Sequence, residues 1–226
     1  MVKIDKESNC GTTIELNNDV VKKTFHLNAI SSRYKPKITD LIVKYFTSLS
    51  TAGIQLPNLI DYDDDLNFKF SYCGISVAKE LSPNPEKYYS ENEFVFDSIV
   101  EICQTAINHN LYLDPHIRNF TYQNGEVYYV DVFPPYSEDY LDLLISFNPH
   151  LKDKLSALFD LFSPHMIAHH FLADFKKTFK NERILLDKLG EKMNNKGLIN
   201  MKNMSLVDWI IDQEEIAYVK KPLPLF

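Results

Sequence analysis

The 226-residue sequence lacks several features that would point to particular classes of protein. Its three cysteines, Cys10, Cys73 and Cys103, are far apart and odd in number, which argues against a disulfide framework and against a CxxC metal site. No apolar run has membrane-spanning length, and the first ten residues are polar, unlike a signal segment. We therefore expect a cytoplasmic protein that does not engage a membrane.

A surplus of basic residues is also absent. The net charge of −7 argues against a large nucleic-acid interface, which needs a basic face. Hydrophobic residues make up 45% of the chain and aromatic residues 13%, enough for a substantial core. The sequence shows no internal repeat and no low-complexity tract. Its length predicts one domain, or one domain built of two lobes.

The first third of the chain carries mainly strand patterns. Residues 12–27 contain two short runs around Asn17-Asn18-Asp19, which predicts a β-hairpin. Apolar residues at helical spacing predict a helix over 36–50. Residues 58–74 predict a second pair of strands, with a turn at 61–65.

Helical patterns dominate the remainder. Residues 82–93 read as a polar connector containing prolines, and 93–109 predict an amphipathic helix. The Asn124-Gly125 pair predicts a tight hairpin. Five further helical segments follow: 139–147, 149–162, 164–179, 182–193 and 205–215. This order predicts an α+β fold with a small strand-rich lobe (1–81) and a mostly helical lobe (82–226).

Three oxygen-bearing side chains lie around the predicted hairpin. Asp114 and Asn119 follow the helix over 93–109, and Asp131 ends the second strand of the hairpin. Taken separately, Asp114 and Asn119 are ordinary turn residues. Together, Asn119 and Asp131 suit Mg²⁺, a hard cation held by few protein ligands plus phosphate oxygens. A third carboxylate, Asp114, can orient an attacking hydroxyl and accept its proton, as phosphoryl transfer requires.

These residues resemble a known family. The segment Asp114-Pro-His116-Ile-Arg-Asn119 resembles the D-x-H-x-x-N catalytic loop of aminoglycoside phosphotransferases and choline kinases, which share the protein-kinase-like fold. The stretch VYYVDVFPP resembles the strand that carries their metal-binding aspartate. The resemblance implies that Asp114 is the catalytic base, that Asn119 and Asp131 bind Mg²⁺, and that His116 supports the loop.

The resemblance also implies a nucleotide site in the first lobe. Either Lys22 or Lys23 would contact the phosphates of ATP, since alternation lets only one face the nucleotide. We favour Lys22 because Val20 shares its face and could line an adenine slot, although Phe25 on the face of Lys23 could pack under the helix. Backbone groups of Ser71, Tyr72 and Cys73 would bond adenine, unless this stretch is a plain edge strand. Gly74 would then turn the chain into the second lobe.

The sequence departs from the family at three points. It has no glycine-rich phosphate loop, since only Gly11 precedes the first hairpin. The helix over 36–50 has no glutamate to pair with the lysine; Asp40 is its one acid, and Glu93 opens a different helix. Tyr112 stands where relatives usually have histidine. These departures weaken phosphate binding and loosen the lysine.

Two further groups of residues leave alternatives open. Arg118 could contact a phosphate or an acidic substrate group, or could form a surface salt bridge. His165 and His169 are spaced as metal ligands on one helical face, but no third ligand is evident, so core or substrate-facing histidines, including His170, fit better.

The sequence therefore predicts a kinase that uses ATP or GTP with Mg²⁺. It would move the γ-phosphoryl group to a hydroxyl, on a small molecule by preference. A minimal protein kinase and a nucleotide-binding pseudokinase are the alternatives.

Overall fold

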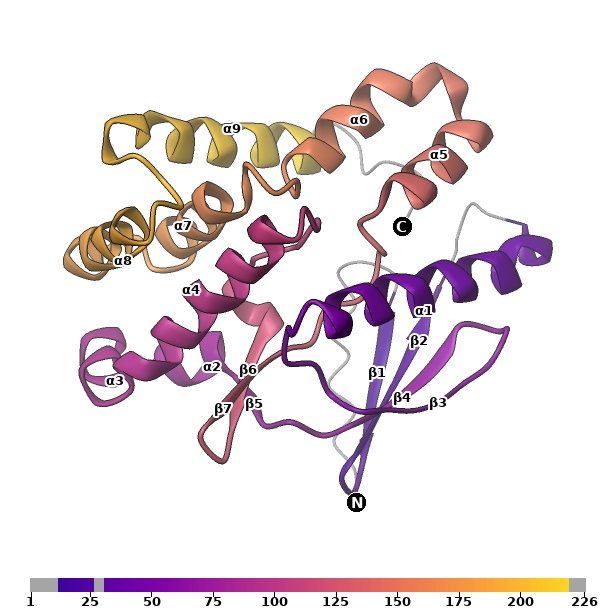
Figure 1. Cartoon of the computed structure of the whole chain (residues 1–226), viewed down its shortest axis with the longest axis horizontal. Coiled ribbons are helices and arrows are strands. Elements are labelled where there is room, and N and C mark those ends of the chain that lie inside the picture. Colours follow the sequence, from indigo (N-terminus) through magenta and orange to yellow (C-terminus); the bar gives the residue numbers. More distant parts are fainter. Residues whose placement is uncertain (1–11, 27–30, 220–226) are drawn as a thin grey trace.

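The computed structural model describes residues 12–26 and 31–219. An antiparallel sheet with strand order β1-β2-β4-β3 forms its N-terminal part, and helix α1 (Lys35–Thr51) lies across one face of that sheet (Figure 1). The strands are β1 (Thr12–Asn17), β2 (Val20–Phe25), β3 (Leu59–Tyr62) and β4 (Asn67–Ser71). The predicted hairpin, helix and strand pair are confirmed.

The sheet packs against α1 through aromatic side chains on one face. Phe46 of α1 lies 5.9 Å from Phe70 of β4, measured between ring centroids. Phe25 and Phe68 are buried on the same face, with centroids 5.5 Å apart. This face therefore belongs to the core, which it extends toward Phe133, whose ring stacks on Phe25 at 4.2 Å.

A small second sheet, order β5-β6-β7, joins the two parts of the chain. Its strands are β5 (Ile75–Ser76), β6 (Phe120–Gln123) and β7 (Glu126–Tyr129). Asn124 and Gly125 have φ of 53° and 89°, the left-handed values that a two-residue turn of this kind needs, so the predicted hairpin is confirmed. At Gly74 φ is +94°, and a Cβ there would lie 1.9 Å from the carbonyl oxygen of Tyr122. Only glycine lets β5 approach β6 this closely.

Helices make up most of the C-terminal part (Figure 1). They are α2 (Val77–Leu81), α3 (Pro85–Glu91), α4 (Glu93–Asn108), α5 (Glu138–Phe147), α6 (Lys152–Asp160), α7 (Ile167–Thr178), α8 (Arg183–Asn195) and α9 (Ser205–Val219). The helix predicted over 93–109 and the five later segments are confirmed. The fold is α+β.

The connector predicted over 82–93 is wrong. Residues 85–91 form α3, because the Asn84 side chain accepts a hydrogen bond from the Lys87 amide at 3.0 Å and Pro85 opens the first turn. Tyr89 of this helix is buried against Phe96, with ring centroids 4.8 Å apart. The polar composition concealed a short capped helix.

Candidate active site

The three predicted side chains come together. The Asn119 side-chain amide donates to the Asp131 carboxylate and to the Asp114 backbone carbonyl, both at 3.2 Å. Asn119 lies in a 3-10 turn (Ile117–Asn119) after the loop, and Asp131 follows β7. The bond from the Val130 amide to the Asn119 carbonyl, at 2.9 Å, fixes the two segments side by side.

Asp114 is buried and held by His116. The His116 ring nitrogen Nδ1 and the His116 amide both contact the Asp114 carboxylate. Burial alone would raise the pKa of Asp114, but His116 and, further away, His170 and Arg118 lower it to about 2. Asp114 is therefore ionised at neutral pH, with its carboxylate oriented by the histidine.

Asp131 has the opposite shift. Burial and the nearby negative charge of Asp114 raise its pKa to about 6, although Lys23 and the Phe133 amide oppose the rise. The buried Asp114 and the half-buried Asp131 thus share a site in which their charge is not fully compensated. Such a site favours a cation, and Asn119 and Asp131 present the oxygen ligands that Mg²⁺ takes.

Lys23, and not Lys22, lies at this cluster. The Lys23 ammonium group donates to the Val130 carbonyl at 2.6 Å, next to Asp131. Burial lowers the pKa of Lys23, and Asp131 and Cys73 partly restore it. The preference for Lys22 is therefore not supported by its position.

The pairing register explains which lysine faces inward. Lys22 is opposite Glu15 and Lys69, and Lys69 is bound to Asp61 on the exposed face. Lys23 is opposite the buried Phe68. Side chains directly opposite each other in a sheet share a face, so Lys23 points to the α1 side and Lys22 away from it. The buried Phe25, two residues after Lys23, was the sequence signal for this.

The three residues expected at adenine do not have equivalent backbones. The Ser71 amide donates to Asn58 at 2.9 Å and the Tyr72 amide to Asp19 at 2.8 Å. The Cys73 amide donates to no backbone carbonyl among the described residues. The buried Cys73 thiol accepts a hydrogen bond from the Thr121 hydroxyl at 3.3 Å. Of the three, Cys73 is the better placed for an external partner.

Other predicted residues fall into two groups. Arg118 is exposed, and its positive charge acts on both Asp114 and Asp131. Asp40 is exposed, and Glu93 pairs with Lys192 at 3.2 Å, so neither acid lies at Lys23. Gly11 lies outside the described residues.

Sequence reasoning missed Asp174. This buried residue of α7 accepts a hydrogen bond from the Ile117 amide at 2.8 Å, and its carboxylate lies 3.8 Å from His116 Nε2. It anchors the loop that carries Asp114 to a helix more than fifty residues later. The pattern HHFLADF gives no local signal of this, because the contact depends on the tertiary packing of α7.

The histidines of the C-terminal part do not form a metal site. His165 pairs with Asp160 at 3.3 Å on the surface, whereas His170 is buried and its Nδ1 contacts the Leu161 carbonyl at 2.9 Å. Across residues 12–26 and 31–219, no three His, Cys, Asp or Glu residues gather as metal ligands. A cation at Asn119 and Asp131 would thus need oxygens from a ligand.

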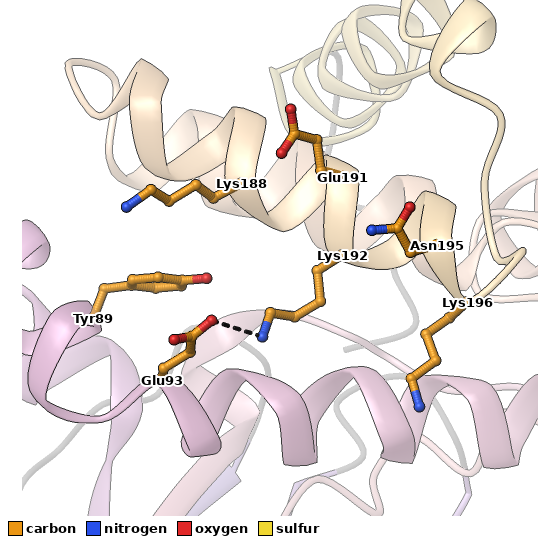
Figure 2. A pocket seen from close by; sticks show the side chains of 7 residues that line it. All are labelled: Tyr89, Glu93, Lys188, Glu191, Lys192, Asn195 and Lys196. Carbon is orange, nitrogen blue, oxygen red and sulfur yellow. Dashed lines mark hydrogen bonds and ion pairs between the residues drawn. The ribbon is translucent and has the colours of Figure 1, made fainter.

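A cavity of about 510 Å³ lies elsewhere, between α8 and the start of α4 (Figure 2). Lys188 lies 5.4 Å from the centre of the Tyr89 ring, and Lys192 contacts Glu93 and Asp97. A second cavity, of about 300 Å³, includes Tyr45 and Tyr112 in its lining. Neither is lined by Asp114, Asn119 or Asp131.

Comparisons with known proteins give little beyond this geometry. No protein family matches the sequence, and no curated protein matches it. Among solved structures, the chain is similar to a choline/ethanolamine kinase family protein from Mesorhizobium loti, with a TM-score of 0.37 and 11% identity, over 92% of this chain and 90% of that one. Within the described part of the chain, no helix has both the length and the apolar character needed to cross a membrane.

Proposed function

We propose that the chain is a phosphotransferase that uses ATP and Mg²⁺ and passes the γ-phosphoryl group to a hydroxyl, by preference on a small molecule. The observation that supports this best is the Asn119 side chain, which bridges the Asp131 carboxylate and the Asp114 backbone in one buried cluster. It unites a candidate base with two candidate metal ligands. We further propose two lobes, 1–81 and 82–226, with the nucleotide between them.

Each residue of the cluster has a role that follows from its environment. Asp114 would orient the acceptor hydroxyl through its carboxylate, which His116 holds in place. With a pKa of about 2 it is a weak base, so alignment of the nucleophile is its main contribution and the proton moves late. Asn119 and Asp131 would hold Mg²⁺, which when bound neutralises charge on the phosphates.

The remaining residues would bind the nucleotide. Lys23 would contact the phosphates in place of Lys22, because its ammonium group lies beside Asp131. Cys73 would offer its backbone to the adenine base. Arg118, exposed at the same loop, would contact a phosphate or an acidic group of the acceptor.

Removal of the candidate base tests the proposal directly. Asp114→Asn should lower kcat by about a thousandfold, within the range for a positioned general base, and leave Mg²⁺-dependent ATP binding intact. Asp131→Asn should instead weaken the thermal shift that Mg²⁺-ATP produces. Transfer of γ-labelled phosphate to a panel of metabolites and a lysate is the measurement, and equal turnover in Asp114→Asn and parent would refute the assignment.

One observation favours a second candidate, a nucleotide-binding protein without turnover. Helix α1 presents the neutral Tyr45, and no acidic side chain, to the cluster. The same labelling experiment separates the candidates: label on a small molecule supports the first proposal, label on a protein supports a protein kinase, and ATP binding without label supports the second candidate.

A further inference from the structure

Two buried tyrosines from distant parts of the chain meet beside the loop that carries Asp114. Tyr45 comes from the middle of α1, and Tyr129 ends β7. The Asp114 amide donates to the Tyr129 hydroxyl at 3.2 Å, and the Tyr45 hydroxyl donates to the Tyr112 carbonyl at 3.0 Å. The two side chains lie close enough for each to act on the pKa of the other. Together the two hydroxyls bind the backbone on either side of Leu113.

The donors and acceptors of these two bonds are consistent. Each hydroxyl has one proton to donate and lone pairs with which to accept. Tyr129 accepts from the Asp114 amide, and Tyr45 donates to the Tyr112 carbonyl. One bond therefore lies just after Leu113 and the other just before it. Leu113 is itself buried, and its amide donates to the Phe162 carbonyl at 2.9 Å.

Both tyrosines are shielded from water. Tyr129 is fully buried and Tyr45 is 4% exposed. A phenol ordinarily keeps its proton at neutral pH, so the Tyr45 hydroxyl can donate across the neutral range.

We propose that Tyr45 and Tyr129 are a positioning pair, which holds the backbone at Asp114 in the orientation needed for transfer and ties it to α1. This inference rests on the proposed function and deepens it. Helix α1 lies on the sheet that carries Lys23, so the pair couples the lysine side of the site to the base side. The neutral Tyr45 hydroxyl thus makes the connection from α1 that an ion pair could have made.

The kinetic test compares three tyrosine-to-phenylalanine variants. Tyr129→Phe leaves the Asp114 amide without its acceptor, and Tyr45→Phe leaves the Tyr112 carbonyl without its donor. Each change should lower kcat about tenfold and should change KM for Mg²⁺-ATP less than about twofold. Tyr140→Phe is the matched control: Tyr140 is fully buried in α5, and its hydroxyl has no partner within residues 12–26 and 31–219. It should keep parental kcat.

Hydrogen exchange at the Asp114 amide gives a readout that does not need turnover. Exchange should be at least about tenfold faster in Tyr129→Phe and Tyr45→Phe than in the parent, and unchanged in Tyr140→Phe. The double variant should exchange at least as fast as either single variant, because it removes both bonds to the loop.

The outcomes separate this inference from the proposed function. Unchanged exchange in both variants would show that the two hydroxyls do not hold the loop. Faster exchange with parental kcat would overturn the positioning role. A parent that transfers no phosphate would refute the proposed function and the catalytic role together, and faster exchange in that case would leave the pair as a structural clamp only. Faster exchange with a selective loss of kcat supports the inference.

Discussion

Two of the places where acidic and basic side chains meet in this molecule differ in almost every physical respect. At the Asp114 cluster, Asp131 and Lys23 lie largely out of water. The pKa of Asp131 is raised and that of Lys23 is lowered, whereas an exposed ion pair would lower the first and raise the second. In the cavity between α8 and the start of α4, here called the groove, Lys192 pairs with Glu93 (Figure 2). Lys192 also pairs with Asp97, and the side chains of Glu93 and Asp97 are 60% and 51% exposed.

The groove is a cavity of about 510 Å³, yet the cluster is the better candidate site. Exposed ion pairs are screened by water and stabilise a protein by about 0–1 kcal/mol. Buried charges that are not fully compensated cost free energy, so a site that keeps them points to a role beyond stability. Volume alone is therefore a poor guide to function here, and the environment of the charges is a better one.

The largest effect expected inside the cluster, beyond loss of Asp114 or Asp131, belongs to Lys23. Lys23→Met keeps the apolar stem and removes the charge, and should lower kcat/KM by about a hundredfold, as removal of one charge-stabilising donor typically does. Lys22→Met is the matched control one residue away, on the opposite face of β2, and should change kcat/KM by less than about threefold. The measurement is the rate of phosphate transfer by the two variants. A larger loss of kcat/KM in Lys22→Met than in Lys23→Met would restore Lys22 as the phosphate contact.

Local patterns in the sequence predicted what depends on local chemistry. The helices over 36–50 and 93–109 follow from apolar spacing, and the hairpin at Asn124-Gly125 follows from the left-handed angles that these residues tolerate. The grouping of Asp114, Asn119 and Asp131 followed from a loop and a hairpin that adjoin in sequence. All of these contacts span fewer than twenty residues.

The features that could not be predicted from the sequence depend on long-range packing. The choice between Lys22 and Lys23 depends on which face of β2 packs on α1, and alternation alone leaves both faces possible. Asp174 meets the loop across 57 positions, and Tyr45 meets Tyr112 across 67. Such contacts need the assembled fold, so a single sequence contains no direct sign of them.

A smaller effect is expected at His169, where burial alone should make the stability of the protein depend on pH. His169 in α7 is buried, neither ring nitrogen has a partner in the described part of the chain, and burial lowers its pKa. Below the unfolded pKa of about 6.5 the unfolded chain binds more protons than the fold, so stability falls as pH falls toward the folded pKa.

His169→Phe should therefore flatten the loss of stability between about pH 7 and pH 5, by roughly 1 kcal/mol for each unit by which the pKa is lowered. Urea unfolding at several pH values is the measurement, with the exposed His165→Asn as the control that should follow the parent. If the stability of His169→Phe falls with pH as steeply as that of the parent, the His169 ring of the parent is protonated in the folded state and has a partner.

The smallest effect is expected in the groove. A different result there would most directly challenge the choice of the Asp114 cluster over the groove as the functional site. Lys192→Met removes the charge that joins α8 to Glu93 and Asp97, and should cost less than about 1 kcal/mol of unfolding free energy because both acids are more than half exposed. The cost should shrink further in 0.5 M salt, since screening weakens exposed pairs, and phosphate transfer should stay at the parental rate. A large loss of transfer in this variant would place the groove, and not the buried cluster alone, in the function of the protein.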